Sequence, residues 1–328
     1  MSRLSGLLGL MLLGCGTAES SLENEDDATL DDPQELRSSG YSAKVTTNPS
    51  PVTVGSLASL DIKINGPRKT QVTEFDSLHT QSMHLIAVSS DLEDFIHVHP
   101  ALQPAGNLTV NATFSRAQPY ALFMEYDPAG RTQPKLSRVR VAPANSRAAK
   151  AKLSATDAFD GSASKTVTVE GTKVELVGTP GGMFMPNMAA HVVVRFKDAG
   201  GGSISNLTDW LGMPAHAIVL SPDLKTFQHL HGTAEATSGS GASGHGDHGN
   251  MGSTKTGPVG VDFTISKAGL YKMFVQFQRG TKVITAPFVL SVMDGHAPSA
   301  PPASCATTTC PNGQSCMVMG SPPLPMCM

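Results

Sequence analysis

The sequence predicts an all-β protein built from two tandem β-sandwich domains, followed by a short disulfide-rich tail. Its 328 residues include 32 glycines and 23 prolines. Set between short runs of Val, Ile, Thr and Phe, these residues favour many short strands joined by turns. A histidine-bearing stretch at Met83–Pro100 also recurs at Ala215–Gly232, with all three histidines at a constant offset of 132 residues. Such self-similarity predicts an internal duplication.

Composition narrows the class of protein. Hydrophobic residues make up 40% and charged residues 16% of the chain, which is typical of globular proteins. The 24 basic and 27 acidic residues give a formal net charge of −3. Since no basic patch stands out, nucleic acid is not expected as a partner.

Residues 1–15 are interpreted as a targeting segment. Arg3 precedes an apolar run, Leu4–Leu13, which is too short to span a bilayer. The Leu-Leu-Gly-Cys sequence ending at Cys15 resembles the bacterial lipobox, which implies lipidation of Cys15 and attachment to a bacterial membrane, with the outer membrane favoured. The alternative is an ordinary signal peptide with a chance cysteine.

The segments outside the two domains have distinct compositions. Residues 16–39 are acidic and poor in hydrophobic residues, which predicts a disordered tether. Residues 294–328 begin with a Pro-rich spacer and carry the four cysteines that remain after Cys15. An even number of cysteines in an exported chain favours disulfides over a zinc site, with the connectivity open. These cysteines are Cys305, Cys310, Cys316 and Cys327.

The first domain is expected at residues 40–143. The alternation in Leu60–Ile64 is that of a half-buried strand, and Asp127–Gly130 has turn chemistry. Seven short strands at such intervals favour an immunoglobulin-like or cupredoxin-like sandwich. They are Ala43–Thr47, Ser56–Ile64, His84–Val88, Phe95–His99, Leu108–Phe114, Tyr120–Tyr126 and Arg138–Val141.

The second domain is expected at residues 165–293, after a small, polar linker at 144–164. Ser59–His99 aligns with it without a gap at the offset of 132, and Tyr120–Tyr126 aligns with Tyr271–Phe277 at an offset of 151. The difference comes mostly from a Gly/Ser-rich insertion at 238–257, whose composition predicts a flexible loop.

The repeated stretch predicts a β-hairpin with histidines at its open end. With Ser89–Asp94 as the turn, Ile86 faces His97 and His84 faces His99. Side chains alternate between faces of a strand, so the three histidines share one face and opposed Cβ atoms lie about 5 Å apart. Three imidazoles at this spacing can converge on one metal ion. The same register in the second copy groups His216, His229 and His231.

This pattern has two interpretations: a metal site, or a merely structural cluster of hydrogen-bonded histidines. Methionines near the histidines favour copper over zinc, because thioether and imidazole ligands together suit copper. Met83 adjoins His84 and Met213 precedes His216, so both are candidate ligands, although methionine is also a common core residue. The secondary candidates are Met183, Met185, Met188, His191, His245, His248 and Met251.

The motif Met-His-Leu-Ile-Ala-Val-Ser-Ser-Asp-Leu…His-Val-His-Pro, followed by Tyr-Ala-Leu-Phe-Met-Glu-Tyr, resembles a recurrent domain of exported bacterial proteins associated with copper and heavy-metal handling. It is more loosely similar to YtkA-like and FixH-like domains and to cupredoxin-like copper chaperones. The resemblance covers both repeats. Carried over, it implies metal ligation by His84, His97 and His99 and by their counterparts, but the second copy has Ala215 for Met83 and Gly232 for Pro100.

The leading functional hypothesis is therefore a lipid-anchored metal-binding protein, with copper ahead of zinc, that buffers or delivers the ion in the cell envelope, on the periplasmic side or at the surface. A metal-transport or envelope protein would be its partner. The alternative is a structural or interaction lipoprotein with immunoglobulin-like domains and no metal. The sequence contains no HExxH, G-x-S-x-G or phosphate-loop motif, so no enzymatic activity is expected.

Overall fold

The computed structural model describes residues 40–131, 133–179, 182–204, 206–235, 257–294, 316–319 and 324–327. The described residues form strands connected by loops, with no α-helix and two short 3-10 turns, Pro67–Lys69 and Ala155–Asp157. None of the helices in this part of the chain is long and apolar enough to cross a membrane. The proposed lipidation site Cys15 and the candidate ligands His245, His248 and Met251 lie outside the described residues.

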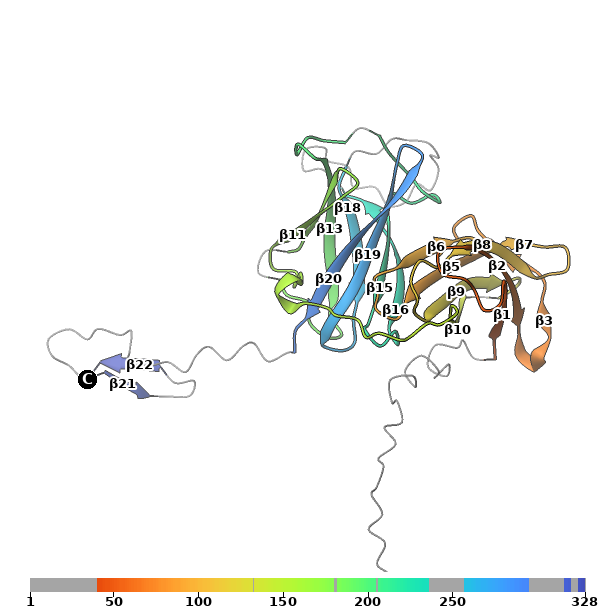
Figure 1. Ribbon diagram of the computed structural model, residues 1–328. Coiled ribbons are helices and arrows are strands. Elements are labelled where there is room, and N and C mark those ends of the chain that lie inside the picture. Colours follow the sequence, from red (N-terminus) through yellow and green to blue (C-terminus); the bar gives the residue numbers. More distant parts are fainter. Residues whose placement is uncertain are drawn as a thin grey trace, which may run out of the picture.

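Two antiparallel sheets form the first domain (Figure 1). One runs β1-β2-β8-β7, with β3 beside β2, and the other runs β10-β9-β5-β6, with β4 beside β9. The strands are β1 (Ser42–Asn48), β2 (Leu57–Asn65), β3 (Gln71–Val72), β4 (Phe75–Asp76), β5 (Met83–Ser89), β6 (Phe95–Val98), β7 (Ala101–Leu102), β8 (Leu108–Thr113), β9 (Tyr120–Pro128) and β10 (Lys135–Val141).

The second domain repeats this architecture. Its sheets run β11-β12-β13-β18-β17 and β14-β19-β15-β16, with β20 beside β19. The strands are β11 (Ser164–Val169), β12 (Thr172–Val177), β13 (Ala189–Asp198), β14 (Leu207–Thr208), β15 (His216–Leu220), β16 (Phe227–His231), β17 (Thr233–Ala234), β18 (Val259–Thr264), β19 (Gly269–Arg279) and β20 (Lys282–Val292).

Each domain is a two-layer sandwich because the apolar faces of its two sheets pack together. In the first domain, Leu60 and Ile62 of β2 share a core with Leu85 of β5 and Leu122 of β9. Val192 and Val194 of β13 are packed in the same way with residues of β15 and β19 in the second domain, including Ala217, Met273 and Val275. The predicted tandem β-sandwich fold is confirmed.

In the tail, β21 (Cys316–Met319) pairs with β22 (Leu324–Cys327), and Cys316 stands opposite Cys327 in the register. Cys305 and Cys310 lie outside the described residues. The disulfides of the tail stay a prediction.

A third apolar cluster joins the two domains. Strands β5 and β15 are buried along their whole length, because one face of each lies in its own core and the other faces the neighbouring domain. The ring of Phe95 stacks on Phe274 and that of Phe123 on Phe227, each with centroids 4.4 Å apart. Figure 1 shows β15 and β16 at the side of the second domain that faces the first.

The interface relates equivalent residues of the two repeats. Phe95 corresponds to Phe227 at the offset of 132, and Phe123 corresponds to Phe274 at the offset of 151. Each stacked pair therefore contains one β6 or β16 residue from one domain and one β9 or β19 residue from the other. The duplicated domains meet through the same face, in the manner of an isologous dimer within a single chain.

Candidate metal centre

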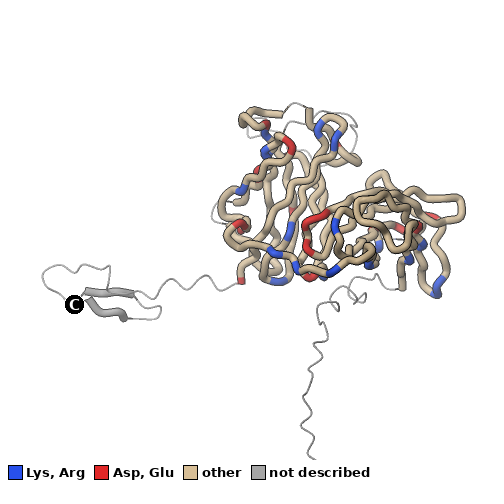
Figure 2. The backbone as a smooth tube through the Cα atoms, viewed as in Figure 1, with Lys and Arg blue, Asp and Glu red and all other residues tan. Residues whose placement is uncertain are grey.

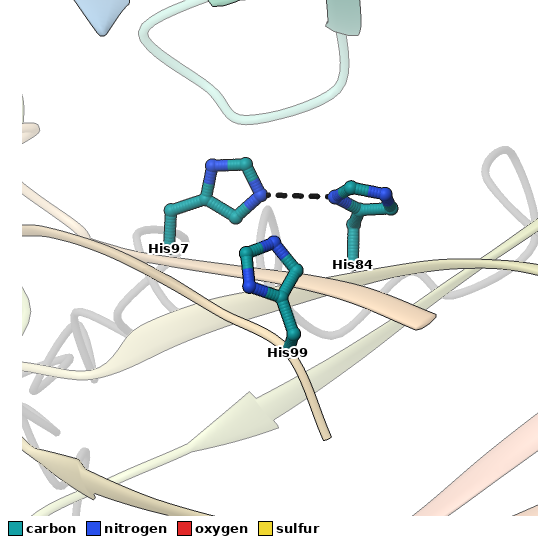
Figure 3. A group of neighbouring side chains, drawn as sticks. All are labelled: His84, His97 and His99. Carbon is teal, nitrogen blue, oxygen red and sulfur yellow. Dashed lines mark hydrogen bonds between the residues drawn. The ribbon is translucent and has the colours of Figure 1, made fainter. Parts of the chain in front are cut away.

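The hairpin β5–β6 gathers the first three histidines as the sequence predicts. Leu85 pairs with Val98 and Ile86 with His97, so the alternation places Leu85 and Val98 towards the core and His84, His97 and His99 on the other face. Their rings point towards one another from the two strands (Figure 3). We call His84, His97 and His99 the first triad; one ring nitrogen from each lies within 4.8 Å of the others.

The hairpin β15–β16 repeats this arrangement. His216 pairs with His231 and Ile218 with His229, and the ligand atoms of His216, His229 and His231 also lie within 4.8 Å of one another. We call these three the second triad. The same turn closes both hairpins: Ser89 and Ser221 donate hydrogen bonds to Asp91 and Asp223, and Leu92 and Leu224 both have positive φ.

The two triads face each other across the domain interface and form what we call the histidine centre. The ring centroids of His84 and His229 are 5.1 Å apart, and those of His97 and His229 are 5.4 Å apart. Centroid distances within the first triad are similar, at 4.9 Å for His84–His99 and for His97–His99 and 5.5 Å for His84–His97. The centre therefore contains six imidazoles contributed equally by the two domains.

Hydrogen bonds fix the tautomers of three of these imidazoles. The Nε2–H group of His84 donates to the Leu78 carbonyl at 3.0 Å. The Nδ1–H group of His97 donates to Oε1 of Gln276 at 2.7 Å, and that of His229 donates to Oε2 of Glu125 at 2.8 Å. A neutral imidazole that donates from one nitrogen presents a lone pair on the other.

The freed lone pairs converge. Nδ1 of His84 and Nε2 of His97 are 3.2 Å apart, and with the tautomers above neither carries a proton. Two nitrogens bound to one tetrahedral ion at about 2.0–2.1 Å would lie about 3.3–3.4 Å apart. The pair is thus spaced as two ligands of one ion.

Several ring nitrogens of the centre are buried without a hydrogen-bond partner. They are Nε2 of His99, His229 and His231 and both nitrogens of His216. Leaving a buried polar group unsatisfied costs about 1–3 kcal/mol, so native proteins rarely leave several together. The residues present fit a metal ion, which would accept the lone pairs of Nε2 of His99, His229 and His231 and of one nitrogen of His216, whose other nitrogen carries the ring proton.

Burial keeps the histidines neutral. Desolvation lowers the pKa of all six, and at least one neighbouring imidazole adds to the effect in each case. At His84 the hydrogen bond to the Leu78 carbonyl and the charge of Glu125 oppose this lowering of the pKa. The pKa falls to about 4 for His99 and for His231. At neutral pH the imidazoles therefore have lone pairs available for a metal without first losing a proton.

Charged residues are scattered along both domains (Figure 2), but one carboxylate belongs to the centre. Glu125 lies opposite His84 on β9 and hydrogen-bonds to His229 of the other domain. Its side chain is 26% exposed, and burial raises its pKa although the nearby histidines oppose the shift. Gln276 is its counterpart: it lies opposite His216 on β19 and bonds to His97.

Sequence reasoning missed four residues around the centre: Glu125, Gln276, His79 and Trp210. Trp210 places its ring 5.0 Å from those of His97 and His216, and His79 places its ring 3.8 Å from that of His231. Glu125 and Gln276 were detectable as a polar residue at the same position of an otherwise mostly apolar strand in both repeats. Nothing in the sequence showed that each would contact the opposite domain.

The methionine predictions need correction. Met83 is fully buried in the core of the first domain, because neighbouring residues of a strand point to opposite faces and His84 takes the interface side. The expectation that it joins His84 as a ligand is wrong. Met213 is half-buried in the turn closed by the Trp210–Met213 bridge, and it is the Trp210 ring of this turn that lies against the histidines.

A separate pocket of about 180 Å³ is lined by the secondary candidates Met183, Met185, Met188 and His191. Met183 and Met188 are 43% and 60% exposed. His191 is engaged elsewhere, since Nδ1 lies 2.8 Å from Asp262 and Nε2 lies 3.3 Å from Glu235. The structure thus brings these four residues together, on the β12–β13 loop and β13 rather than at the histidine centre.

The chain belongs to the family described as Domain of unknown function (DUF8832), whose model matches residues 37–142 and 166–294, one segment for each repeat. No curated protein shows significant similarity to the chain.

Solved structures that match the chain share little sequence with it and have low TM-scores. Domains 4 and 5 of the S-layer protein SbsC are 13% identical over 76% of this chain and 98% of theirs, with a TM-score of 0.19. An ICAM-5 D1–D4 ectodomain fragment is 13% identical over 77% and 53%, with a TM-score of 0.18. The α2-macroglobulin of E. coli is 13% identical over 78% and 16%, with a TM-score of 0.21. At these scores the sandwich assignment rests on the strand pairing described above.

Proposed function

We propose that this protein binds transition-metal ions in the histidine centre between its two domains. The observation that carries the proposal is the set of buried, unpartnered ring nitrogens contributed by both triads. A purely structural histidine cluster would be expected to satisfy these groups with protein hydrogen bonds. A metal ion would satisfy most of them at once, because the lone pairs of His99, His229 and His231 and the one lone pair of His216 would become ligands.

Copper is the first candidate ion and zinc the second. Six neutral imidazoles suit both ions, and the affinity of a nitrogen site for divalent ions is higher for copper than for zinc. With Met83 in the core, this preference rests on imidazole rather than on thioether ligands. The centre would hold the ion away from bulk solvent, since His84 and His216 are fully buried.

The proposed role is to buffer the ion or deliver it to a metal-transport or envelope protein on the outer side of a bacterial membrane. This part rests on the lipobox-like sequence ending at Cys15 and on the acidic segment that follows it. A lipid anchor would hold the domains at the membrane. Exchange of Cys15→Ser should move the protein from the membrane fraction to the soluble fraction; an unchanged distribution would exclude the anchor.

A second candidate is a structural or interaction lipoprotein that binds no metal. The stacked pairs Phe95–Phe274 and Phe123–Phe227 favour it, because this apolar interface can hold the domains together alone. In that case the histidines would serve only to fill the interface.

Titration of the chain from Gly16 onward with Cu(II), Cu(I) and Zn(II) separates the two. We expect up to two equivalents to bind, and binding to be lost when all six triad histidines are changed to alanine. A variant with His191→Ala is the matched control, because this histidine lies outside the centre, and it should bind as the parent does. Binding that survives the six changes but disappears with His245→Ala/His248→Ala would transfer the site to the loop, and no binding at all would leave the structural role.

A further inference from the structure

The two triads have different supporting groups at one pair of equivalent positions. The carboxylate of Glu125 accepts a hydrogen bond from His229 of the second triad, whereas the amide oxygen of Gln276 accepts one from His97 of the first triad. Glu125 and Gln276 occupy the same place in their repeats, opposite His84 and His216 respectively. Each is contributed by the domain that does not hold the histidine it contacts.

A carboxylate and an amide act differently on a metal ligand. Both accept the Nδ1–H proton and so hold Nε2 towards the centre. The carboxylate also makes the imidazole a stronger donor and brings a negative charge close to the ion. The amide orients its histidine but leaves a buried divalent charge without compensation, which is costly in a medium of low dielectric constant.

We propose that metal ions fill the two triads in a fixed order, the second triad before the first, which rests on the metal-binding function proposed above. Glu125 sets this order as a positioning residue that acts from the opposite domain. The ligand class is a divalent transition-metal ion. Because Glu125 and Gln276 both reach across the interface, an ion in either triad is held by ligands of one domain and a supporting residue of the other. Metal affinity is therefore coupled to the contact between the domains.

The order of filling is tested by titrating two double variants of the chain from Gly16 onward with Zn(II). His97→Ala/His99→Ala leaves the second triad, and His229→Ala/His231→Ala leaves the first. We expect the second triad alone to bind Zn(II) about 10- to 100-fold more tightly than the first alone, the range by which such supporting groups change metal affinity.

Two nearly isosteric exchanges then test the carboxylate itself. With the second triad alone, Glu125→Gln should weaken Zn(II) binding about 10- to 100-fold. With the first triad alone, Gln276→Glu should strengthen binding by a similar factor. A gain of affinity cannot come from mere damage to the fold, and the melting temperature of each metal-free variant checks that both exchanges leave the domains folded.

Four outcomes are distinguishable. The expected order with opposite effects of the two exchanges supports the inference. Equal affinities of the two triads, or a Glu125→Gln effect that is the same for both, overturns it while leaving metal binding intact. Tighter binding by the first triad also overturns it. Absence of Zn(II) binding in the unaltered chain overturns the inference, and absence of copper binding as well overturns the proposed function.

Discussion

The first and second triads have three histidines in the same register, but their surroundings differ. His84 of the first triad donates to the Leu78 carbonyl, whereas both nitrogens of its counterpart His216 are unpartnered. The turn before each hairpin also differs: the first domain contributes the His79 ring to the second triad, and the second domain contributes the Trp210 ring to the first. The two repeats share the histidines but differ in the groups that contact them.

The two triads are compared most directly by removing one triad at a time and measuring the bound metal. We expect His84→Ala/His97→Ala/His99→Ala and His216→Ala/His229→Ala/His231→Ala each to abolish one equivalent of bound metal, because each triad holds an ion with its own three nitrogens. Metal content after dialysis measures this. If either variant loses all metal, the six histidines form one site and the two-triad description fails.

The domain interface is the second target. Phe274→Ala removes one member of a stacked pair and should lower the free energy of unfolding by about 3 kcal/mol. It should also weaken metal binding, since the hydrogen bonds of Glu125 and Gln276 cross this interface. Chemical denaturation and metal titration give the two quantities.

Phe114→Ala is the matched control for this change. Phe114 is a fully buried phenylalanine in the core of the first domain and away from the interface. Its loss should lower stability by a comparable amount while the metal affinity of the folded protein stays the same. Equal losses of affinity in both variants would show that the interface has no special role.

Acidification should lower the stability of the metal-free protein, because its triad histidines are buried and neutral. Burial lowers the folded-state pKa of His99 and His231 to about 4, against 6.5 in the unfolded chain. The unfolded state then binds more protons between these values, so stability is fully present above about pH 6.5 and falls as the pH drops towards 4. Glu125, whose pKa is raised by burial, opposes this trend.

Thermal melting between pH 7 and 4 measures this dependence. The variant with all six histidines changed to alanine should lose most of it. A parent protein whose melting temperature is flat over this range would show that the histidines are not held neutral.

The smallest effect is expected at Met83 and its counterpart Ala215, which are both buried in their cores. Met83→Leu keeps the volume and should cost less than about 1.5 kcal/mol without changing the affinity for Cu(I) or Zn(II). Thermal melting and metal titration test both parts. A selective loss of Cu(I) affinity would return Met83 to the set of ligands.

The sequence was sufficient to predict both hairpins. Side chains alternate between the two faces of a strand, and the numbers of paired residues in an antiparallel hairpin add up to a constant, so the two rules determine which residues share a face. Ile86 opposite His97 and Ile218 opposite His229 follow from these rules alone. The same rules should have excluded Met83, since residues 83 and 84 cannot point to one face of a regular strand.

The contact between the two triads could not be predicted from the sequence. Phe95 and Phe123 share the histidine face of the first domain, and an apolar face of this kind indicates a contact surface. It does not identify the partner, which is the equivalent face of the other repeat. The roles of Glu125 and Gln276 follow only from that contact, because each lies opposite a histidine of its own domain and bonds to one of the other.

X-ray absorption spectroscopy of the chain loaded with one equivalent of Zn(II) shows directly whether the histidine centre holds the ion. We expect a shell of nitrogen or oxygen scatterers at about 2.0–2.1 Å with the multiple-scattering features of at least three imidazoles, and no sulfur at about 2.3 Å. The spectrum should change in His216→Ala/His229→Ala/His231→Ala and stay the same in His191→Ala. A sulfur shell, or a spectrum unaffected by removal of both triads, would show that the histidine centre does not hold the ion.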